Sequence, residues 1–150
     1  MHRIAPILLL LALCSGAWSE QKTIEQLKAE AEKAEGGNQA KLYAEIARQM
    51  VDVANQQFTL GYSDKGQATV QEILQYAGKA HDLALSARNN RKEVEIHLRQ
   101  TQRHLESVKR TLSADDRPAL EAAEAKLAQF RQDLLDAMFA PKQEPKQEKK

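Results

Sequence analysis

Cysteine is almost absent from this chain, and its one example, Cys14, lies in an apolar N-terminal segment. A protein with a single cysteine cannot form an internal disulfide or a metal site built from several thiolates. Glycine is also scarce, with 6 residues in 150. No glycine-rich phosphate loop and no Gly-x-Ser-x-Gly motif occurs. The sequence therefore carries neither of these two signatures of catalytic sites.

Strand signals are scarce as well. Aromatic residues make up only 5% of the chain, and no run of β-branched or aromatic residues alternates with polar ones. Between residues 20 and 140 the sequence is instead rich in Ala, Leu, Glu, Gln, Lys and Arg, which are strong helix formers. We therefore expect an all-α protein.

An excess of charge of one sign is missing too. The chain has 22 basic and 21 acidic residues, and loss of a leader containing Arg3 would leave the two equal. A basic stretch from Arg88 to Arg110 contains no aromatic residue on which a nucleic-acid base could stack. We therefore expect no nucleic-acid partner.

The N-terminus has the pattern of a secretory signal peptide. His2 and Arg3 precede an apolar run over residues 4–13, and small residues follow up to Ser19. The run is too short to span a membrane, which takes roughly 20 apolar residues. We expect cleavage near Ser19 and export of the mature protein, which would then be periplasmic or secreted. A buried N-terminal helix is the alternative interpretation.

A lipid anchor is a second alternative for this segment. Leu11, Ala12, Leu13 and Cys14 resemble the lipid-attachment box of bacterial lipoproteins, although that box normally has a small residue before the cysteine. Lipidation at Cys14 would anchor the protein to a membrane instead of releasing it.

The remaining sequence predicts helices joined by short turns. Thr23 and Gln26 fit a capping box, which predicts a first helix over residues 23–35 that the Gly-Gly-Asn sequence at 36–38 ends. A wide apolar face predicts a second helix over residues 39–60. The last helix is expected to start at the Asp-Asp-Arg-Pro cluster at 115–118, with an acidic cap and a first-turn proline.

Between these elements the spacing favours one long central helix over residues 65–112. Its stripe keeps alternating steps of three and four: Val70, Ile73, Ala77, Ala80, Ala84, Ala87, Arg91, Val94, Leu98, Thr101, Leu105, Val108 and Leu112. A loop would reset that phase, and neither Gly nor Pro interrupts residues 79–117. The alternative is a break at Asn89 and Asn90, which would give two shorter helices and a more compact bundle.

The predicted architecture is therefore an antiparallel helical bundle or an elongated helical scaffold around the central helix. We expect a signal peptide over residues 1–19, one helical domain over 20–140 and a disordered tail over 141–150, where a Pro-Lys-Gln-Glu sequence repeats. A basic segment over 88–112 precedes an acidic one over 113–139, which favours pairing of the two as a hairpin.

Residues with reactive side chains do not cluster. After the predicted cleavage site only His81, His97 and His104 remain, and none belongs to a zinc-binding or di-iron motif. His97 and His104 are seven residues apart, or about 10 Å along a helix, too far to share one ion. We therefore expect no catalytic, cofactor-binding or metal site, and no enzymatic activity.

Aromatic residues in the first half suggest a partner surface made of Tyr43, Phe58, Tyr62 and Tyr76, although core packing is the alternative role for them. The segment over 42–80 also has small and aromatic residues at Ala54, Phe58, Gly61, Tyr62, Ala68, Tyr76 and Ala80. In these positions it resembles a tetratricopeptide-type helical pair, and that resemblance implies protein–protein binding. The whole chain is otherwise similar to small exported helical bacterial proteins of unknown function.

Together these features predict an exported, non-catalytic protein that self-associates or binds another helical protein. The contact would use the part of the apolar stripe that packing within the chain leaves uncovered. The alternative is a lipid-anchored structural protein of the cell envelope. Neither hypothesis identifies the partner.

Overall fold

The computed structural model describes residues 21–140, and every regular element in that range is a helix. The elements are α1 (Ile24–Lys33), α2 (Gly36–Thr59), α3 (Ser63–Ala87), α4 (Arg91–Lys109) and α5 (Arg117–Phe139). The predicted all-α fold class is confirmed. The predicted signal peptide, Cys14 and the predicted C-terminal tail lie outside the described residues.

The predicted central helix over residues 65–112 is wrong, because the chain reverses direction at residues 88–90. Arg88 and Asn90 both have a left-handed backbone conformation, with φ angles of 62° and 56°. A right-handed helix cannot continue through such residues. The structure therefore has the alternative that the sequence left open, a break at Asn89 and Asn90, and it is a compact bundle instead of an elongated scaffold.

The start of α2 holds this turn in place. The side-chain amide of Asn90 donates a hydrogen bond to Oδ1 of Asn38 over 2.9 Å. Gly37 lies so close to the turn that a Cβ atom there would sit 2.7 Å from the backbone oxygen of Asn89. Only glycine leaves room for this approach of two backbones. The turn therefore depends on a segment 50 residues or so earlier in the chain, as well as on its own sequence.

Arg91 explains why the apolar phase did not reveal the turn. This residue does face inward, as the stripe requires, but it does so as a cap for two helix ends. Its guanidinium donates to the backbone oxygens of Ala84 (3.1 Å), Leu85 (2.8 Å) and Ala137 (3.1 Å). These carbonyls belong to the last turns of α3 and α5, where no intrahelical donor is left for them.

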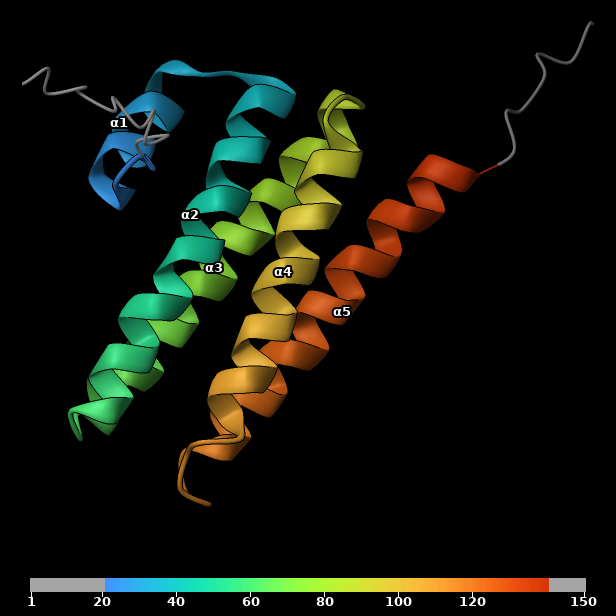
Figure 1. Ribbon diagram of the computed structural model, residues 1–150. Coiled ribbons are helices and arrows are strands. Elements are labelled where there is room, and N and C mark those ends of the chain that lie inside the picture. The colour runs from blue at the N-terminus through green and yellow to red at the C-terminus, as the bar shows by residue number, and fades with distance from the viewer. Residues whose placement is uncertain (1–20, 141–150) are drawn as a thin grey trace, which may run out of the picture.

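The turn divides the bundle into two helical hairpins that lie side by side (Figure 1). One hairpin is α2–α3 and the other is α4–α5. α4 packs on α2 and α5 packs on α3, whereas the consecutive helices α3 and α4 touch each other little. α1 packs mainly on α2, and Nζ of Lys28 on α1 also lies 5.6 Å from the centroid of the Tyr76 ring on α3. The core therefore lies between the two hairpins.

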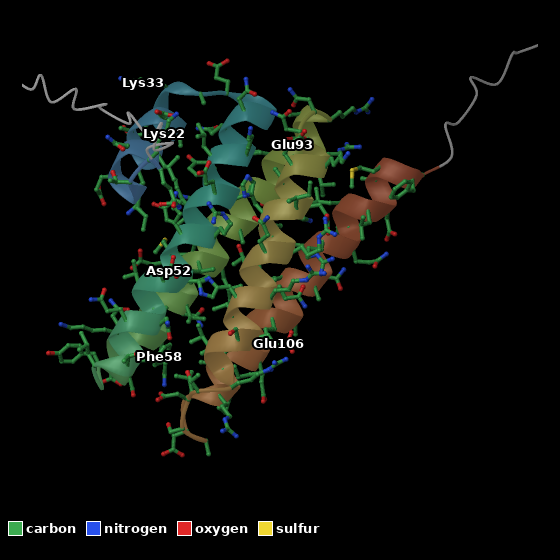
Figure 2. The ribbon with its side chains drawn as sticks, in the orientation of Figure 1. Lys22, Lys33, Asp52, Phe58, Glu93 and Glu106 are labelled. Atoms are coloured by element: carbon green, nitrogen blue, oxygen red, sulfur yellow. The ribbon has the colours of Figure 1, made fainter. Side chains whose placement is uncertain are left out.

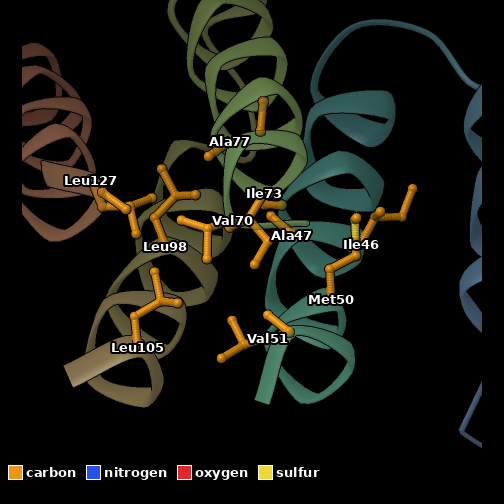
Figure 3. Packing of buried hydrophobic residues seen from close by; sticks show 14 of the residues in the cluster. Ile46, Ala47, Met50, Val51, Val70, Ile73, Ala77, Leu98, Leu105 and Leu127 are labelled. Carbon is orange, nitrogen blue, oxygen red and sulfur yellow. The ribbon is translucent and has the colours of Figure 1, made fainter. Parts of the chain in front are cut away.

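Small residues line the contact between α2 and α3, and larger ones fill the centre. The fully buried alanines of these two helices are Ala40, Ala44, Ala47, Ala54, Ala77, Ala80 and Ala84. Near the middle of the bundle Leu98 lies between Leu127 and Val70 (Figure 3), and all three are completely buried. None of the helices within residues 21–140 combines the length and apolar character that crossing a membrane requires.

α1 begins as predicted and ends early. The predicted capping box is confirmed, since the Gln26 amide donates to Oγ1 of Thr23 (3.2 Å) and the Thr23 amide donates to Oε1 of Gln26 (2.9 Å). The helix stops at Lys33, two residues before the predicted end. Gly36 has the expected positive φ of 58°, but it starts α2 instead of ending α1.

The predicted pairing of α4 with α5 is confirmed. Each of the two helices supplies a cation to one ion pair and a carboxylate to another. Nζ of Lys109 on the basic α4 lies 2.7 Å from Oε2 of Glu124 on the acidic α5, and this hydrogen bond raises the pKa of Lys109. Nε of Arg131 on α5 donates in turn to Oε1 of Glu95 on α4 over 3.0 Å. Net charge therefore favours the hairpin without accounting for each contact.

Two glycines inside α3 are expected to respond in opposite ways to alanine. A Cβ atom on Gly66 would lie 2.7 Å from the ring of Phe58, whereas one on Gly78 would meet Phe130 at 3.6 Å, an ordinary contact. Gly78→Ala should raise the free energy of unfolding by about 1 kcal/mol, the usual preference of a helix for alanine. Gly66→Ala should lower it by about 1 kcal/mol, because overpacking exceeds that gain. Urea unfolding of both variants measures this difference, and effects of the same sign would contradict it.

Candidate functional site

The four aromatic residues of the predicted partner surface lie in two separate places. The rings of Tyr43 and Tyr76 have their centroids 5.8 Å apart and are partly buried, with Lys79 over both. Phe58 is nearly buried, toward the other end of α2 (Figure 2), about 22 Å from Tyr43 by the helical rise. Tyr62 follows it in the α2–α3 turn and is 53% exposed. The structure thus places Phe58 and Tyr62 near the α2–α3 turn, and Tyr43 with Tyr76 further along the hairpin.

His81 lies between two carboxylates, a group that the sequence analysis did not find. Its Nδ1 is 2.8 Å from Oδ1 of Asp82, and its Nε2 is 3.0 Å from Oδ2 of Asp133 on α5. The ring is buried and stacks on Phe130, with centroids 4.7 Å apart. Because both ring nitrogens are already engaged, neither is available to a substrate in this arrangement. The group joins α3 to α5.

The histidines of α4 face α2. Burial lowers the pKa of His97, with the negative charge of Glu45 acting in the opposite direction, and the buried Nδ1 of His97 has no hydrogen-bond partner among the described residues. Nε2 of His104 lies 3.4 Å from Oδ1 of Asp52. Over residues 21–140 no group of three or more His, Cys, Asp or Glu residues is placed to hold a metal ion.

Asp116 lies between α4 and α5 and joins this connection to the start of α3, next to the α2–α3 turn. Its carboxylate accepts hydrogen bonds from Nε2 of Gln67 (3.0 Å), Oγ of Ser63 (2.9 Å) and Oγ of Ser113 (3.2 Å). These bonds, that of Gln67 most of all, hold the pKa of Asp116 below its ordinary value. Asp116 precedes α5 as predicted, but its side chain makes no helix-capping hydrogen bond. Its predicted role as a cap is wrong, because these three donors occupy the carboxylate.

We expect acid to weaken the bundle partly through Asp116. Its pKa in the folded protein is below that in the unfolded chain, so the ionised carboxylate stabilises the fold above the unfolded pKa of about 4. This contribution is lost as the pH falls through the folded pKa. Asp116→Asn should therefore flatten the loss of stability below about pH 4 in urea unfolding experiments. Asp64→Asn, a change at an exposed carboxylate of α3, is the control. Identical pH profiles for Asp116→Asn and the parent would contradict this expectation.

A groove of about 460 Å³ lies between α4 and α5. Figure 1 shows α5 leaning away from α4 toward the C-terminal end of α5. The groove is lined by Lys92, Glu95, Ile96 and Arg99 from α4 and by Arg131, Leu135, Met138 and Phe139 from α5. The spacing within each set places its members on one face of their helix. Phe139 is 79% exposed, more than any other large apolar residue in the described range.

The groove has a basic wall on α4 and an apolar wall on α5. Glu95 is only 5% exposed and lies 3.0 Å from Nε of Arg131 and 3.1 Å from Nη2 of Arg99. Arg131 also donates to Oε1 of Gln102 over 2.8 Å. One carboxylate is thus shared by two guanidinium groups. Lys92 is exposed and forms no ion pair within residues 21–140. The groove therefore carries an excess of positive charge.

The sequence analysis missed this groove, although a signal for it was present. Met138, near the end of α5, is only partly buried. Leu134 is buried within the bundle, whereas Leu135 and Phe139 line the groove. Apolar residues at the end of α5 therefore cover more of the helix circumference than one core face requires. The width of this apolar face is the feature of the sequence that could have indicated a second, exposed contact surface.

Comparison of the chain with protein-family models, curated proteins and solved structures finds no match. The resemblance to a tetratricopeptide-type pair stays a prediction. α2 and α3 do form an antiparallel pair, but such pairs occur in many helical folds. Functional inference therefore rests on the residues of this chain alone.

Proposed function

We propose that this protein is an exported, non-catalytic interaction protein that binds a partner protein in the groove between α4 and α5. The observation that carries the proposal is the apolar end of α5, where Leu135, Met138 and the exposed Phe139 face Ile96 across the groove. Exposed apolar grooves between two helices commonly receive a helix of another protein. This surface replaces the stripe of the predicted central helix as the proposed contact.

Two further observations support the non-catalytic part of the proposal. His81 has both ring nitrogens engaged by carboxylates, and Glu95 is balanced by Arg99 and Arg131. The His81 cluster joins α3 to α5 and the Glu95 cluster joins α4 to α5, and a substrate could reach a ring nitrogen of His81 only by displacing a carboxylate. Neither cluster contains a hydroxyl or thiol nucleophile.

Export is proposed from the N-terminal sequence, and intact-mass measurement of the protein from its native source tests it. A mass that begins after Ser19 supports the exported form, and it removes Cys14 together with the leader. A mass that retains Cys14 and carries acyl groups would favour the alternative, a lipid-anchored envelope protein. A full-length unmodified chain would contradict export.

Site-specific photo-crosslinking tests the groove in the native source. We would place benzoylphenylalanine at Phe139, and in a matched variant at Tyr62, which is the exposed aromatic residue of the α2–α3 turn. The proposal expects one discrete crosslinked protein from position 139 and none from position 62. Both positions are exposed aromatic sites, so the probe should disturb the fold equally little at each.

The outcomes of this crosslinking are distinct. A product from position 62 alone would move the partner surface to the α2–α3 turn and contradict the groove. The same set of products from both positions would indicate non-specific contact. No product at either position, with the protein at its natural level, would contradict an interaction function.

A further inference from the structure

We infer that the segment bound in the groove is an acidic amphipathic helix with two carboxylates about two helical turns apart. This inference rests on the proposed function and adds the chemistry of the partner. The apolar face of such a helix would lie on Leu135, Met138 and Phe139, and its acidic edge would face Lys92 and Arg99 on α4.

The charge of the groove selects an anionic occupant. Its ionisable lining residues are Lys92, Arg99 and Arg131 against Glu95 alone, and this carboxylate is already shared by the two arginines. A second copy bound symmetrically would bring two positively charged grooves face to face, because a two-fold contact joins the same surface on both partners. Such a contact is unfavourable, since like charges at an interface cost free energy. An acidic partner matches the groove, whereas a second copy does not.

The spacing of the basic wall selects a helix. Lys92 and Arg99 are seven residues apart on α4, which places them on one face and about 10 Å apart. Ile96 lies between them on the same side. A helix lying along α4 with acidic residues at i and i+7 would satisfy both cations and contact Ile96 between them. A fatty acid or a similar amphiphile has a single head group and would meet only one cation.

The test uses designed helical peptides and the purified protein. One labelled peptide has a leucine stripe with glutamates at i and i+7 on its edge, and two others carry glutamine or lysine at those positions. Fluorescence anisotropy gives each affinity. We expect the glutamate peptide to bind about tenfold more tightly than the glutamine peptide, from two partly exposed ion pairs worth up to about fivefold each, and to weaken with added salt.

Variants of the protein locate the contact. Lys92→Glu with Arg99→Gln should remove the preference for glutamate, and the lysine peptide should bind this variant better than it binds the parent. Arg131 still pairs with Glu95 in this variant, so the buried carboxylate keeps a partner. The matched control is Lys33→Glu with Arg103→Gln, at two exposed residues outside the groove. It should leave all affinities unchanged. Circular dichroism verifies folding.

Each result has one meaning. Equal affinities for the three peptides would overturn the inference while leaving an apolar partner site intact. Displacement of the glutamate peptide by laurate at lower concentration than by unlabelled peptide would identify an amphiphile as the occupant and overturn it as well. Absence of binding by any peptide overturns the inference, and the crosslinking at Phe139 then decides separately whether the proposed function stands.

Discussion

Arg91→Leu is expected to lower the free energy of unfolding by about 3 kcal/mol, because the change removes three hydrogen bonds from a charged donor. The carbonyls of Ala84, Leu85 and Ala137 would lose their donor, and the added apolar surface of leucine offsets only part of that loss. If residues 65–112 formed a continuous helix, the same substitution would extend the apolar stripe and stabilise it. The sign of the effect therefore distinguishes the two architectures. Urea unfolding measures it.

Two control variants accompany this measurement. Arg103→Leu makes the same chemical change at an exposed residue of α4 and should shift stability by less than about 0.5 kcal/mol. Arg91→Lys retains the charge without the fork of donors, so most of the loss should remain. If Arg91→Leu and Arg103→Leu behaved alike, the capping role of Arg91 would be wrong.

Leu98→Ala is expected to cost about 2–5 kcal/mol, the range for a buried leucine that leaves a cavity. Leu98 is completely buried where the two hairpins meet, near Val70 and Leu127 (Figure 3), so neither hairpin can close the cavity alone. Leu60→Ala is the matched control, because Leu60 is 61% exposed. We expect it to change stability by less than about 0.5 kcal/mol. Thermal unfolding of both variants gives the comparison, and a loss below 1 kcal/mol for Leu98→Ala would contradict the packing.

Local signals in the sequence were sufficient for the elements themselves. The capping box at Thr23, the break after Leu60 and the proline at 118 mark helix ends through the backbone chemistry of the chain nearby. Short turns and complementary charge also favoured the α4–α5 hairpin. These features depend on neighbouring residues, which is why the fold class and most helix boundaries could be predicted.

The central turn could not be predicted because its causes are distant in the sequence. Asn90 bonds to Asn38, and Asn89 fits against Gly37, both at the start of α2. The stripe also keeps its phase through Arg91, since that residue caps helix ends while facing inward. Periodicity reports which side of a segment is inside, and a hairpin of two inward-facing helices can have the same phase as one long helix.

The groove depends on tertiary structure in a different way. Each residue that lines it is ordinary for an amphipathic helix, and only the divergence of α4 and α5 leaves Phe139 and Met138 uncovered. Buried ion pairs such as that of Glu95 with Arg131 join residues on two helices and have no local pattern. Sequence analysis therefore identified aromatic residues as the partner surface, although the structure covers three of those four at least partly.

The turn at residues 88–90 also bears on how the chain behaves when concentrated. Arg88 is held in a left-handed conformation that costs about 1–2 kcal/mol for an ordinary residue, and straightening the turn would release this strain. Because the apolar phase continues across the turn, two straightened chains could exchange their α4–α5 hairpins and rebuild the same core between them. If such domain swapping occurs, Arg88→Gly should reduce it, because glycine adopts the left-handed conformation without strain.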